Sequence, residues 1–355
     1  MTEVNLITFQ TILDYIQNVK EYVVSDYITD ITWSTKLPLF ARMLRGKGLG
    51  KLLRKYLGIQ VNIVRPTAEV YNFNSVDKKW CLDFLMYCLR NSSNLVFNLN
   101  YFNEEDRREI LKFVRNKVYG AFLDSIRKDV IFDDADLRYE LEYEEKIYKR
   151  VVKKSNYYVL ESNEGKRYVL PINHFEPVVF YHKYGLSEIP DSVKESIVEK
   201  DVIDAGGFIG DSALILNELN PKTIYVFEPL KSNIMLLRKT IELNNLRNVD
   251  VIEKALGSNE GVAYMFPAFS GSFISDLGTE KVDVTTIDKF VAEKSANIGL
   301  IKMDIEGYEL EALKGAEKTI QSHKPVLIIS IYHTGEEFFE VPKLLKSLVP
   351  EYRFR

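Results

Sequence analysis

Residues 202–216 read VIDAGGFIGDSALIL, an apolar strand followed by a glycine-rich turn and the start of a helix. Asp204 stands near the end of the strand, and Gly206, Gly207 and Gly210 form the turn. Glycine is needed where the backbone bends sharply and a ligand must approach it closely. The N–H groups at the start of the following helix also point at such a site. This stretch therefore predicts a ligand-binding turn, although an ordinary glycine turn shows the same pattern.

The spacing within the turn narrows the choice of ligand. A dinucleotide fingerprint has the order G-x-G-x-x-G, whereas this turn has the order D-x-G-x-x-x-G, beginning at Asp204. A carboxylate next to a diphosphate is unfavourable because both are negative. The same carboxylate suits a ligand with a cationic amino-acid end.

The segments that follow repeat the pattern of strand, turn and helix, which indicates a mostly parallel sheet covered by helices. TIYVFEP (223–229) ends in Glu228, and an acid there can accept hydrogen bonds from both ribose hydroxyls. VDVIEKALG (249–257) predicts a third strand, with a nucleobase beside Ala255 and Leu256.

LIKMDIEG (300–307) is another apolar strand, and it ends in acids. Alternation along a strand places Asp304 and Glu306 on one side. Ligands of open α/β sheets bind outside the carboxyl ends of the strands, so we expect Asp204, Glu228, Asp304 and His333 to converge there. Asp304 or His333 could act as a general base for a hydroxyl, and Glu306 could position the acceptor or tune His333. Three alternatives remain: a divalent cation held by Asp304, Glu306 and His333, Glu306 as a helix cap, and His333 as a helix-cap or core residue.

The chain from residue 199 to about 350 resembles the FkbM-type S-adenosylmethionine-dependent methyltransferases. The resemblance rests on VIDAGGFIG, VFEPLKSNIMLLRKTIELNN, EKALGSNEG, VDVTTIDKF, LIKMDIEGYELEALKGAEKTI and KPVLIISIYH. It implies the class I methyltransferase fold, a Rossmann-like doubly wound α/β sheet, and methylation of hydroxyls on sugars, polysaccharides and polyketide-type products.

The resemblance also implies roles for particular residues of this chain. Asp204, Gly206 and Gly210 match the first S-adenosylmethionine motif, and Glu228 matches the ribose-binding acid. Lys254 and Ala255 match the adenine-side turn, Asp304 and Glu306 match the acidic pair after the fourth strand, and His333 matches a histidine after the fifth. The family's sheet normally closes with a sixth and a seventh strand. We expect the sixth to begin or run at residues 351–355, which implies a truncated domain or a sheet finished differently.

Residues 1–150 predict a mainly helical region. Apolar stripes at helical spacing occupy residues 6–23 and 78–90, and residues 103–130 begin with Asn103 as a helix N-cap. The charged residues 133–154 predict a solvated helix or linker. Residues 151–198 predict a β-hairpin, with strands on either side of Asn163-Glu164-Gly165, and a connecting segment. Residues 199–355 form the third region, the methyltransferase-like domain.

Composition excludes several classes of protein. The chain has 355 residues, 46% of them hydrophobic, and a net charge of −4, which is ordinary for a globular protein and argues against a nucleic-acid partner. No stretch reaches about 18 uncharged apolar residues, so we expect no transmembrane segment. Two cysteines, Cys81 and Cys88, predict buried apolar residues and a reducing, cytoplasmic location.

Two further segments suggest ligand contacts. Residues 36–55 are basic, are interleaved with apolar residues and contain no acid. This stretch could lie on an anionic membrane or bind an acidic glycan, and the alternative is a solvated basic face. Residues 269–278 could be a lid over substrate or a plain connecting loop.

The sequence thus predicts an S-adenosylmethionine-dependent O-methyltransferase with no metal in its site. We expect a carbohydrate or small-molecule hydroxyl acceptor, and an N-terminal region that selects the acceptor or mediates homo-oligomerisation. The alternatives are a nicotinamide-dependent oxidoreductase, for which no Tyr-x-x-x-Lys pair stands out, and a non-catalytic glycan-binding or scaffold protein.

Overall fold

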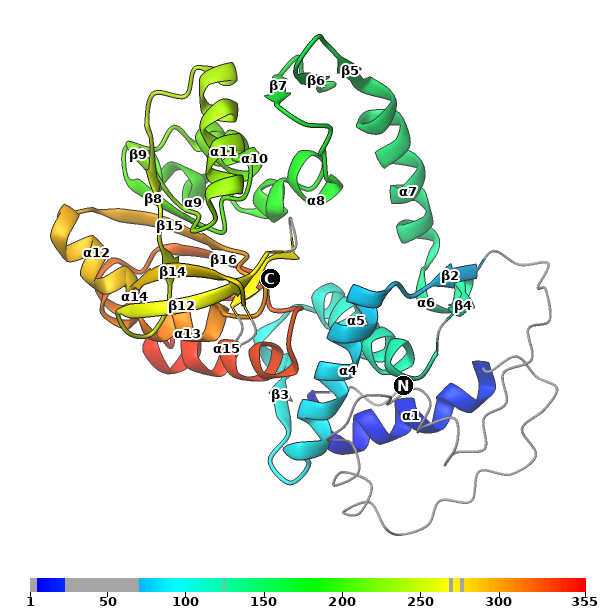
Figure 1. Ribbon diagram of the computed structural model, residues 1–355. Coiled ribbons are helices and arrows are strands. Elements are labelled where there is room, and N and C mark those ends of the chain that lie inside the picture. Colours follow the sequence, from blue (N-terminus) through cyan, green and yellow to red (C-terminus); the bar gives the residue numbers. More distant parts are fainter. Residues whose placement is uncertain (1–4, 23–69, 124, 268–270, 275–277) are drawn as a thin grey trace. The chain divides into compact units, whose positions relative to one another are not determined.

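The computed structural model describes residues 5–22, 70–123, 125–267, 271–274 and 278–355 (Figure 1). The chain divides into two compact units, each described here by itself. The first unit comprises residues 1–134, 332–343 and 351–355, and the second comprises residues 135–331 and 344–350.

A parallel five-stranded sheet forms the centre of the second unit. Its strands are β8 (Asp201–Ala205), β9 (Thr223–Phe227), β10 (Val249–Ile252), β15 (Ile298–Met303) and β16 (Val326–Ile329). Their order is β10-β9-β8-β15-β16, and every neighbouring pair is parallel. The strand order reverses between β8 and β15, which is the topological switch point where such sheets bind ligands. The predicted Rossmann-like doubly wound sheet is confirmed.

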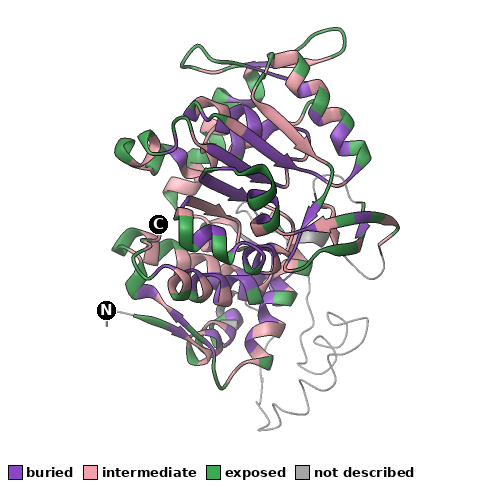
Figure 2. Cartoon of the chain, turned by 90° about the vertical axis from the view of Figure 1, so that its left-hand side faces the viewer, coloured by how far each residue is buried: buried purple, intermediate pink, exposed green. Residues whose placement is uncertain are grey.

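Helices cover this sheet, and its middle strands are buried along their whole length. Every residue of β8 and β15 is buried, as expected for parallel strands covered on both faces, and they lie in the purple centre of the cartoon in Figure 2. The main helices are α10 (Asp211–Leu216), α11 (Lys231–Asn244), α12 (Ile287–Lys294), α13 (Glu309–Lys314) and α14 (Glu317–His323). The 3-10 helix η4 (Asn217–Leu219) follows α10.

The third predicted strand is divided between two sheets. The predicted continuous strand over 249–257 is wrong, because β10 ends at Ile252 and β11 (Ala255–Leu256) pairs with β14 (Glu280–Thr285) instead. The second sheet has the order β11-β14-β12-β13, with β12 (Gly261–Phe266) and β13 (Phe273–Ile274). A lid at residues 269–278 stays a prediction, since 269, 270 and 275–277 lie outside the described residues.

The predicted β-hairpin is confirmed. β6 (Tyr158–Glu161) and β7 (Arg167–Leu170) pair antiparallel, and Gly165 in the turn has φ +76°. β5 (Val151–Lys153) adds a third strand beside β6. The charged stretch forms the helix α7 (Asp134–Lys146), which has no fully buried residue. The remaining short elements of this unit are η2 (Tyr148–Arg150), α8 (Pro177–Phe180), η3 (Lys183–Glu188) and α9 (Asp191–Glu195).

Helices predominate among the described residues of the first unit, in line with the mainly helical N-terminal region that the sequence predicts. Its helices are α1 (Phe9–Tyr22), α4 (Ser75–Arg90), η1 (Leu99–Tyr101), α5 (Glu104–Phe122) and α6 (Lys128–Ile131). Two small antiparallel pairs join β1 (Leu6–Thr8) to β3 (Val96–Asn98) and β2 (Val70–Asn72) to β4 (Ser125–Arg127). The Asn103 side chain accepts a hydrogen bond from the Asp106 N–H at 2.9 Å, which confirms the predicted N-cap of α5. Residues 335–343, the first part of α15 (Gly335–Leu348), bring Phe338 and Phe339 into its aromatic core.

Several smaller predictions also meet the structure. Cys81 and Cys88 are buried free thiols, as expected. The sixth strand expected at residues 351–355 is wrong, because these residues contain no strand. The basic stretch 36–55 lies outside the described residues. Among the helices that are described, none has the length and apolar content needed to cross a bilayer.

Candidate active site

A cavity of about 70 Å³ lies at the carboxyl ends of β8, β9 and β15. It belongs wholly to the second unit and adjoins the switch point of the sheet. Its walls include a group of predicted site residues: Gly206, Glu228, Lys254, Ala255, Asp304 and Glu306. The sequence analysis missed other wall residues, among them Phe208, Asn233, Met265, Ser272, Ile274 and Tyr308. Three neighbouring parallel strands thus bring most of the predicted residues to one place.

The glycine turn is shaped by close backbone contact with the end of β15. Gly206 has φ +80°, and a Cβ at this position would lie 1.9 Å from the Asp304 carbonyl oxygen. A Cβ on Gly207 would lie 2.0 Å from Val226 Cγ1, and Gly210 has φ +85° immediately before α10. All three glycines therefore allow the turn to pack closely, and Gly206 also lines the cavity.

Glu228 follows β9 and turns its carboxylate into the cavity wall. The carboxylate accepts hydrogen bonds from the Phe208 N–H at 3.0 Å, the Leu230 N–H at 2.9 Å and the Asn233 side chain at 3.3 Å. Burial raises the pKa of Glu228 to about 7, although these hydrogen bonds act in the opposite direction. A carboxylate has about four acceptor positions, so the three donors leave room for one hydroxyl.

Asp204 is placed differently from Glu228. It is fully buried and does not line the cavity, and its carboxylate lies 3.1 Å from Lys302 Nζ and accepts a hydrogen bond from Ser212 Oγ at 2.6 Å. Lys302 Nζ also donates to the Gly206 carbonyl at 2.9 Å. Burial acts to lower the pKa of Lys302, but the charges of Asp204 and Asp304 outweigh it and raise the pKa. Because Lys302 neutralises Asp204, the expected repulsion of a diphosphate does not follow from Asp204.

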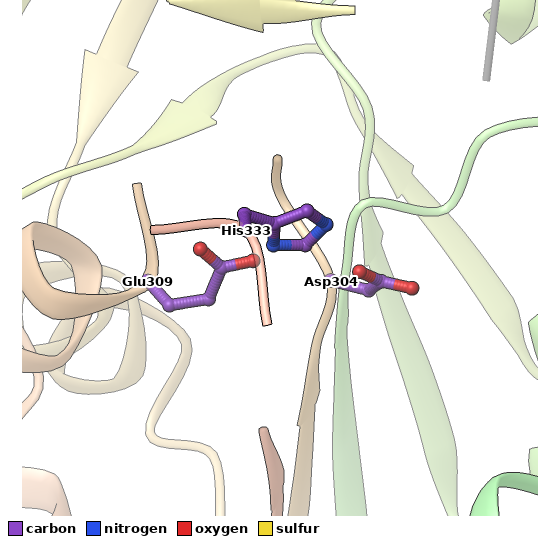
Figure 3. A group of neighbouring side chains, drawn as sticks. All are labelled: Asp304, Glu309 and His333. Atoms are coloured by element: carbon purple, nitrogen blue, oxygen red, sulfur yellow. The ribbon is translucent and has the colours of Figure 1, made fainter. Parts of the chain in front are cut away.

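The turn after β15 carries the acids that line the cavity. Figure 3 shows the side chains of Asp304, at the end of β15, and Glu309, at the start of α13. The fully buried Glu309 carboxylate accepts hydrogen bonds from the Ile305 N–H at 2.7 Å and the Gly307 N–H at 3.0 Å. It holds a turn in which Glu306 has φ +59° and Gly307 has φ +102°. Since Tyr308 is the N-cap residue of α13, Glu306 is not its helix cap.

His333, also labelled in Figure 3, belongs to the first unit. It is 1% exposed, and its ring lies edge-on to Trp80 with centroids 5.3 Å apart. The adjacent Tyr332 ring lies 4.1 Å from it. These contacts fit a histidine whose ring is held by aromatic packing.

Two charged residues of the second unit escaped the sequence analysis although the sequence carried a signal for each. Lys302 interrupts an otherwise apolar strand, and a lysine is almost never fully buried without a partner. Glu309 comes two residues after Gly307, at the start of a helix, where an acid is favoured. Neither signal names the partner, which the structure supplies.

Comparisons with known proteins identify the domain that contains this cavity. Residues 204–355 match the family model described as the methyltransferase FkbM domain, which confirms the predicted resemblance. A curated relative, "Methyltransferase 1" of Beauveria bassiana (strain ARSEF 2860), is 21% identical over 207 residues, covering 50% of this chain and 80% of that protein.

Solved structures give weaker likenesses. The crystal structure of the methyltransferase FkbM from Methylobacillus flagellatus KT is 18% identical, with a TM-score of 0.48, covering 90% of this chain and 67% of that chain. The putative methyltransferase SMU.1697c from Streptococcus mutans, solved in complex with SAH, is 14% identical, with a TM-score of 0.29, covering 50% and 83% of the two chains.

Proposed function

We propose that the chain is an S-adenosylmethionine-dependent O-methyltransferase, because residues 204–355 match the methyltransferase FkbM domain family. Its acceptor is a hydroxyl of a sugar, glycan or related natural product. The observation that carries the proposal is the cavity at the switch point, which Gly206 lines and where the Glu228 carboxylate retains room for a hydroxyl donor.

The wall residues fit the parts of this cofactor. Glu228 would hold the ribose, Ala255, Leu256 and the Lys254 stem would lie against the adenine, and Gly206 would face the amino-acid end. Asp204, Gly207 and Gly210 would act through the shape of the turn, since Asp204 is held by Lys302. When bound, the cofactor supplies a methyl group activated by a positive sulfonium.

The protein's own contribution to methyl transfer would be orientation and proton removal. An acceptor oxygen must be held about 3 Å from the methyl carbon and in line with the breaking bond, and such positioning supplies much of the acceleration. Asp304 and His333 are the proposed bases for the acceptor hydroxyl, and Glu306, which lines the cavity, would position the acceptor. The Glu309 carboxylate fixes the turn that carries Asp304 and Glu306.

Calorimetry with S-adenosylhomocysteine, using NAD as the comparison ligand, tests the cofactor assignment. We expect micromolar binding of S-adenosylhomocysteine and none of NAD. A ligand at 100 times its dissociation constant adds about 2.7 kcal/mol of stability, so thermal shift provides a second readout. Tight NAD binding without S-adenosylhomocysteine binding would instead favour the oxidoreductase.

Transfer of labelled methyl groups to a panel of soluble sugars tests the chemistry. Asp304→Asn should abolish transfer while S-adenosylhomocysteine still binds, because Asp304 acts on the acceptor. His333→Asn tests the second base in the same way. Full transfer by Asp304→Asn would overturn its role, and cofactor binding without transfer to any sugar would leave the binding or scaffold alternative.

A further inference from the structure

The first unit contains a second cavity, of about 160 Å³. Its walls come from β2, α4 and α5 and include Tyr71, Phe73, Asp77, Cys81, Phe113 and Lys117. The volume corresponds to on the order of ten water positions, the scale of a single sugar ring. None of these residues takes part in the site proposed for the cofactor.

Lys117 is the feature that gives this cavity its chemistry. The residue is only 8% exposed, and its Nζ donates to the Tyr332 carbonyl at 2.8 Å. Its other partners are the rings of Trp80 at 5.3 Å and Phe113 at 5.1 Å. Within the described parts of the chain, no carboxylate oxygen lies within 4.0 Å of Lys117 Nζ, the distance of an ion pair. Burial lowers the pKa of Lys117, because a desolvated ammonium without a full counter-charge is unfavourable.

A ligand anion would supply the missing counter-charge, and Asp77 limits which anion fits. Asp77 lines the same cavity and accepts hydrogen bonds from Tyr71 Oη at 2.9 Å and the Asn74 N–H at 3.2 Å. Its negative charge disfavours a dianion such as phosphate. Its carboxylate has further acceptor positions for hydroxyl donors. Phe113 and Phe73 line the same cavity and make part of its wall apolar.

We propose that this cavity binds a sugar acid, with the sugar carboxylate on Lys117, a sugar hydroxyl on Asp77 and the sugar ring against the aromatic walls. This site lies within the first unit and adds a second ligand to the cofactor of the proposed function. The link is local: Lys117 is bonded to Tyr332, the chain neighbour of the proposed base His333, within one unit. A bound carboxylate would therefore act on the segment that carries His333.

Calorimetry on the full chain with glucuronate, glucose and inorganic phosphate tests the proposal. Glucuronate should bind at least about tenfold more tightly than glucose or phosphate. Lys117→Met keeps the length of the side chain and removes its charge, and should weaken glucuronate binding by about tenfold or more. Lys112→Met is the matched control on the same helix, because Lys112 pairs with Glu109 and Asp133 and does not line the cavity. It should bind glucuronate as the unchanged protein does.

A second variant keeps the test decisive if Lys117→Met fails to fold. Cys81→Leu adds volume at the cavity wall and keeps the ammonium, so it should also weaken glucuronate binding. Equal binding of glucuronate and glucose, or unchanged glucuronate binding in both variants, would overturn the sugar-acid assignment. S-adenosylhomocysteine binding is measured on each protein. If the unchanged protein binds glucuronate but not S-adenosylhomocysteine, the proposed function is contradicted and the ligand of this cavity is not. If it binds S-adenosylhomocysteine but not glucuronate, only this inference is contradicted.

Discussion

Asp204 and Glu228 occupy comparable places on neighbouring strands of one sheet, yet their charges are compensated in opposite ways. Asp204 lies near the end of β8, and its carboxylate meets the Lys302 ammonium and the Ser212 hydroxyl, both from within the protein. Glu228 directly follows β9 and is held by two backbone N–H groups and one amide, none of which carries a full charge. Burial consequently raises the pKa of Glu228 to about 7.

This difference in partners indicates that Asp204 supports the structure of the site, whereas Glu228 is available to a ligand. A buried acid with its own lysine has little to gain from a further donor. A buried acid supported only by neutral donors gains when a ligand supplies another hydrogen bond. Asp204 is therefore expected to govern stability, and Glu228 is expected to govern cofactor binding.

Removing the lysine should give the largest effect. Lys302→Met leaves Asp204 buried without its partner, and breaking a buried pair in this way costs about 3–5 kcal/mol of unfolding free energy. Urea denaturation measures the loss. The double variant Lys302→Met with Asp204→Asn is the control, because it removes both charges and should recover part of the stability. A loss below about 1 kcal/mol in the single variant would show that Asp204 does not depend on Lys302.

Removing the charge of Glu228 should affect binding more than stability. Glu228→Gln keeps the size of the side chain, and we expect S-adenosylhomocysteine to bind about 10–100-fold more weakly. Calorimetry measures the dissociation constant, and urea denaturation should show a smaller change than in Lys302→Met. If Glu228→Gln mainly lost stability and kept its cofactor affinity, Glu228 would govern stability, as Asp204 is expected to do, and would not govern cofactor binding.

The pH dependence should single out Glu228 in the same way. Its pKa is raised from 4.5 to about 7 in the folded protein, so the stabilisation by the protonated form is complete below pH 4.5 and is lost as the pH rises through 7. Ribose hydroxyls donate to the ionised form, so S-adenosylhomocysteine binding should tighten between about pH 6 and 8, by up to about tenfold per unit below the pKa.

Asp211 provides the control for this pH profile. Burial raises its pKa to about 6, against the opposing charges of Lys302 and His174, so it titrates in a neighbouring range. Asp211→Asn should keep the pH dependence of binding, whereas Glu228→Gln should flatten it. A profile that flattened only in Asp211→Asn would assign the titration to Asp211.

The sequence was sufficient for the residues that stand at strand ends. Gly206, Glu228 and Asp304 could be predicted because an apolar run shows where each strand stops, and parallel strands expose their carboxyl ends at one edge. The hairpin at Gly165 was predictable for a similar local reason, since its turn requires a positive φ.

The partners of these residues could not be predicted, because they depend on register. Lys302 and Asp204 are directly opposite each other on β15 and β8, and a shift of one residue would have placed the lysine on the other face. The departure of β11 from the central sheet depends on its pairing with β14, a contact that no short stretch of sequence encodes. The position of Asp204 outside the cavity wall follows from the same register.

Weakening one neutral donor to Glu228 should give the smallest effect. Asn233 Nδ2 donates to Glu228 Oε1 over 3.3 Å, and this hydrogen bond lowers the pKa of Glu228. Asn233→Ala should weaken S-adenosylhomocysteine binding by about two- to fivefold and move the midpoint of its pH profile upward. Met235→Ala, at a position 69% exposed on the same helix, should change neither quantity. If the midpoint stayed in place in Asn233→Ala, the backbone N–H groups of Phe208 and Leu230 would be the hydrogen-bond donors that oppose the effect of burial on the pKa of Glu228. Asp204 would then differ from Glu228 in having a charged side chain, Lys302, as its partner, whereas Glu228 depends on main-chain N–H groups.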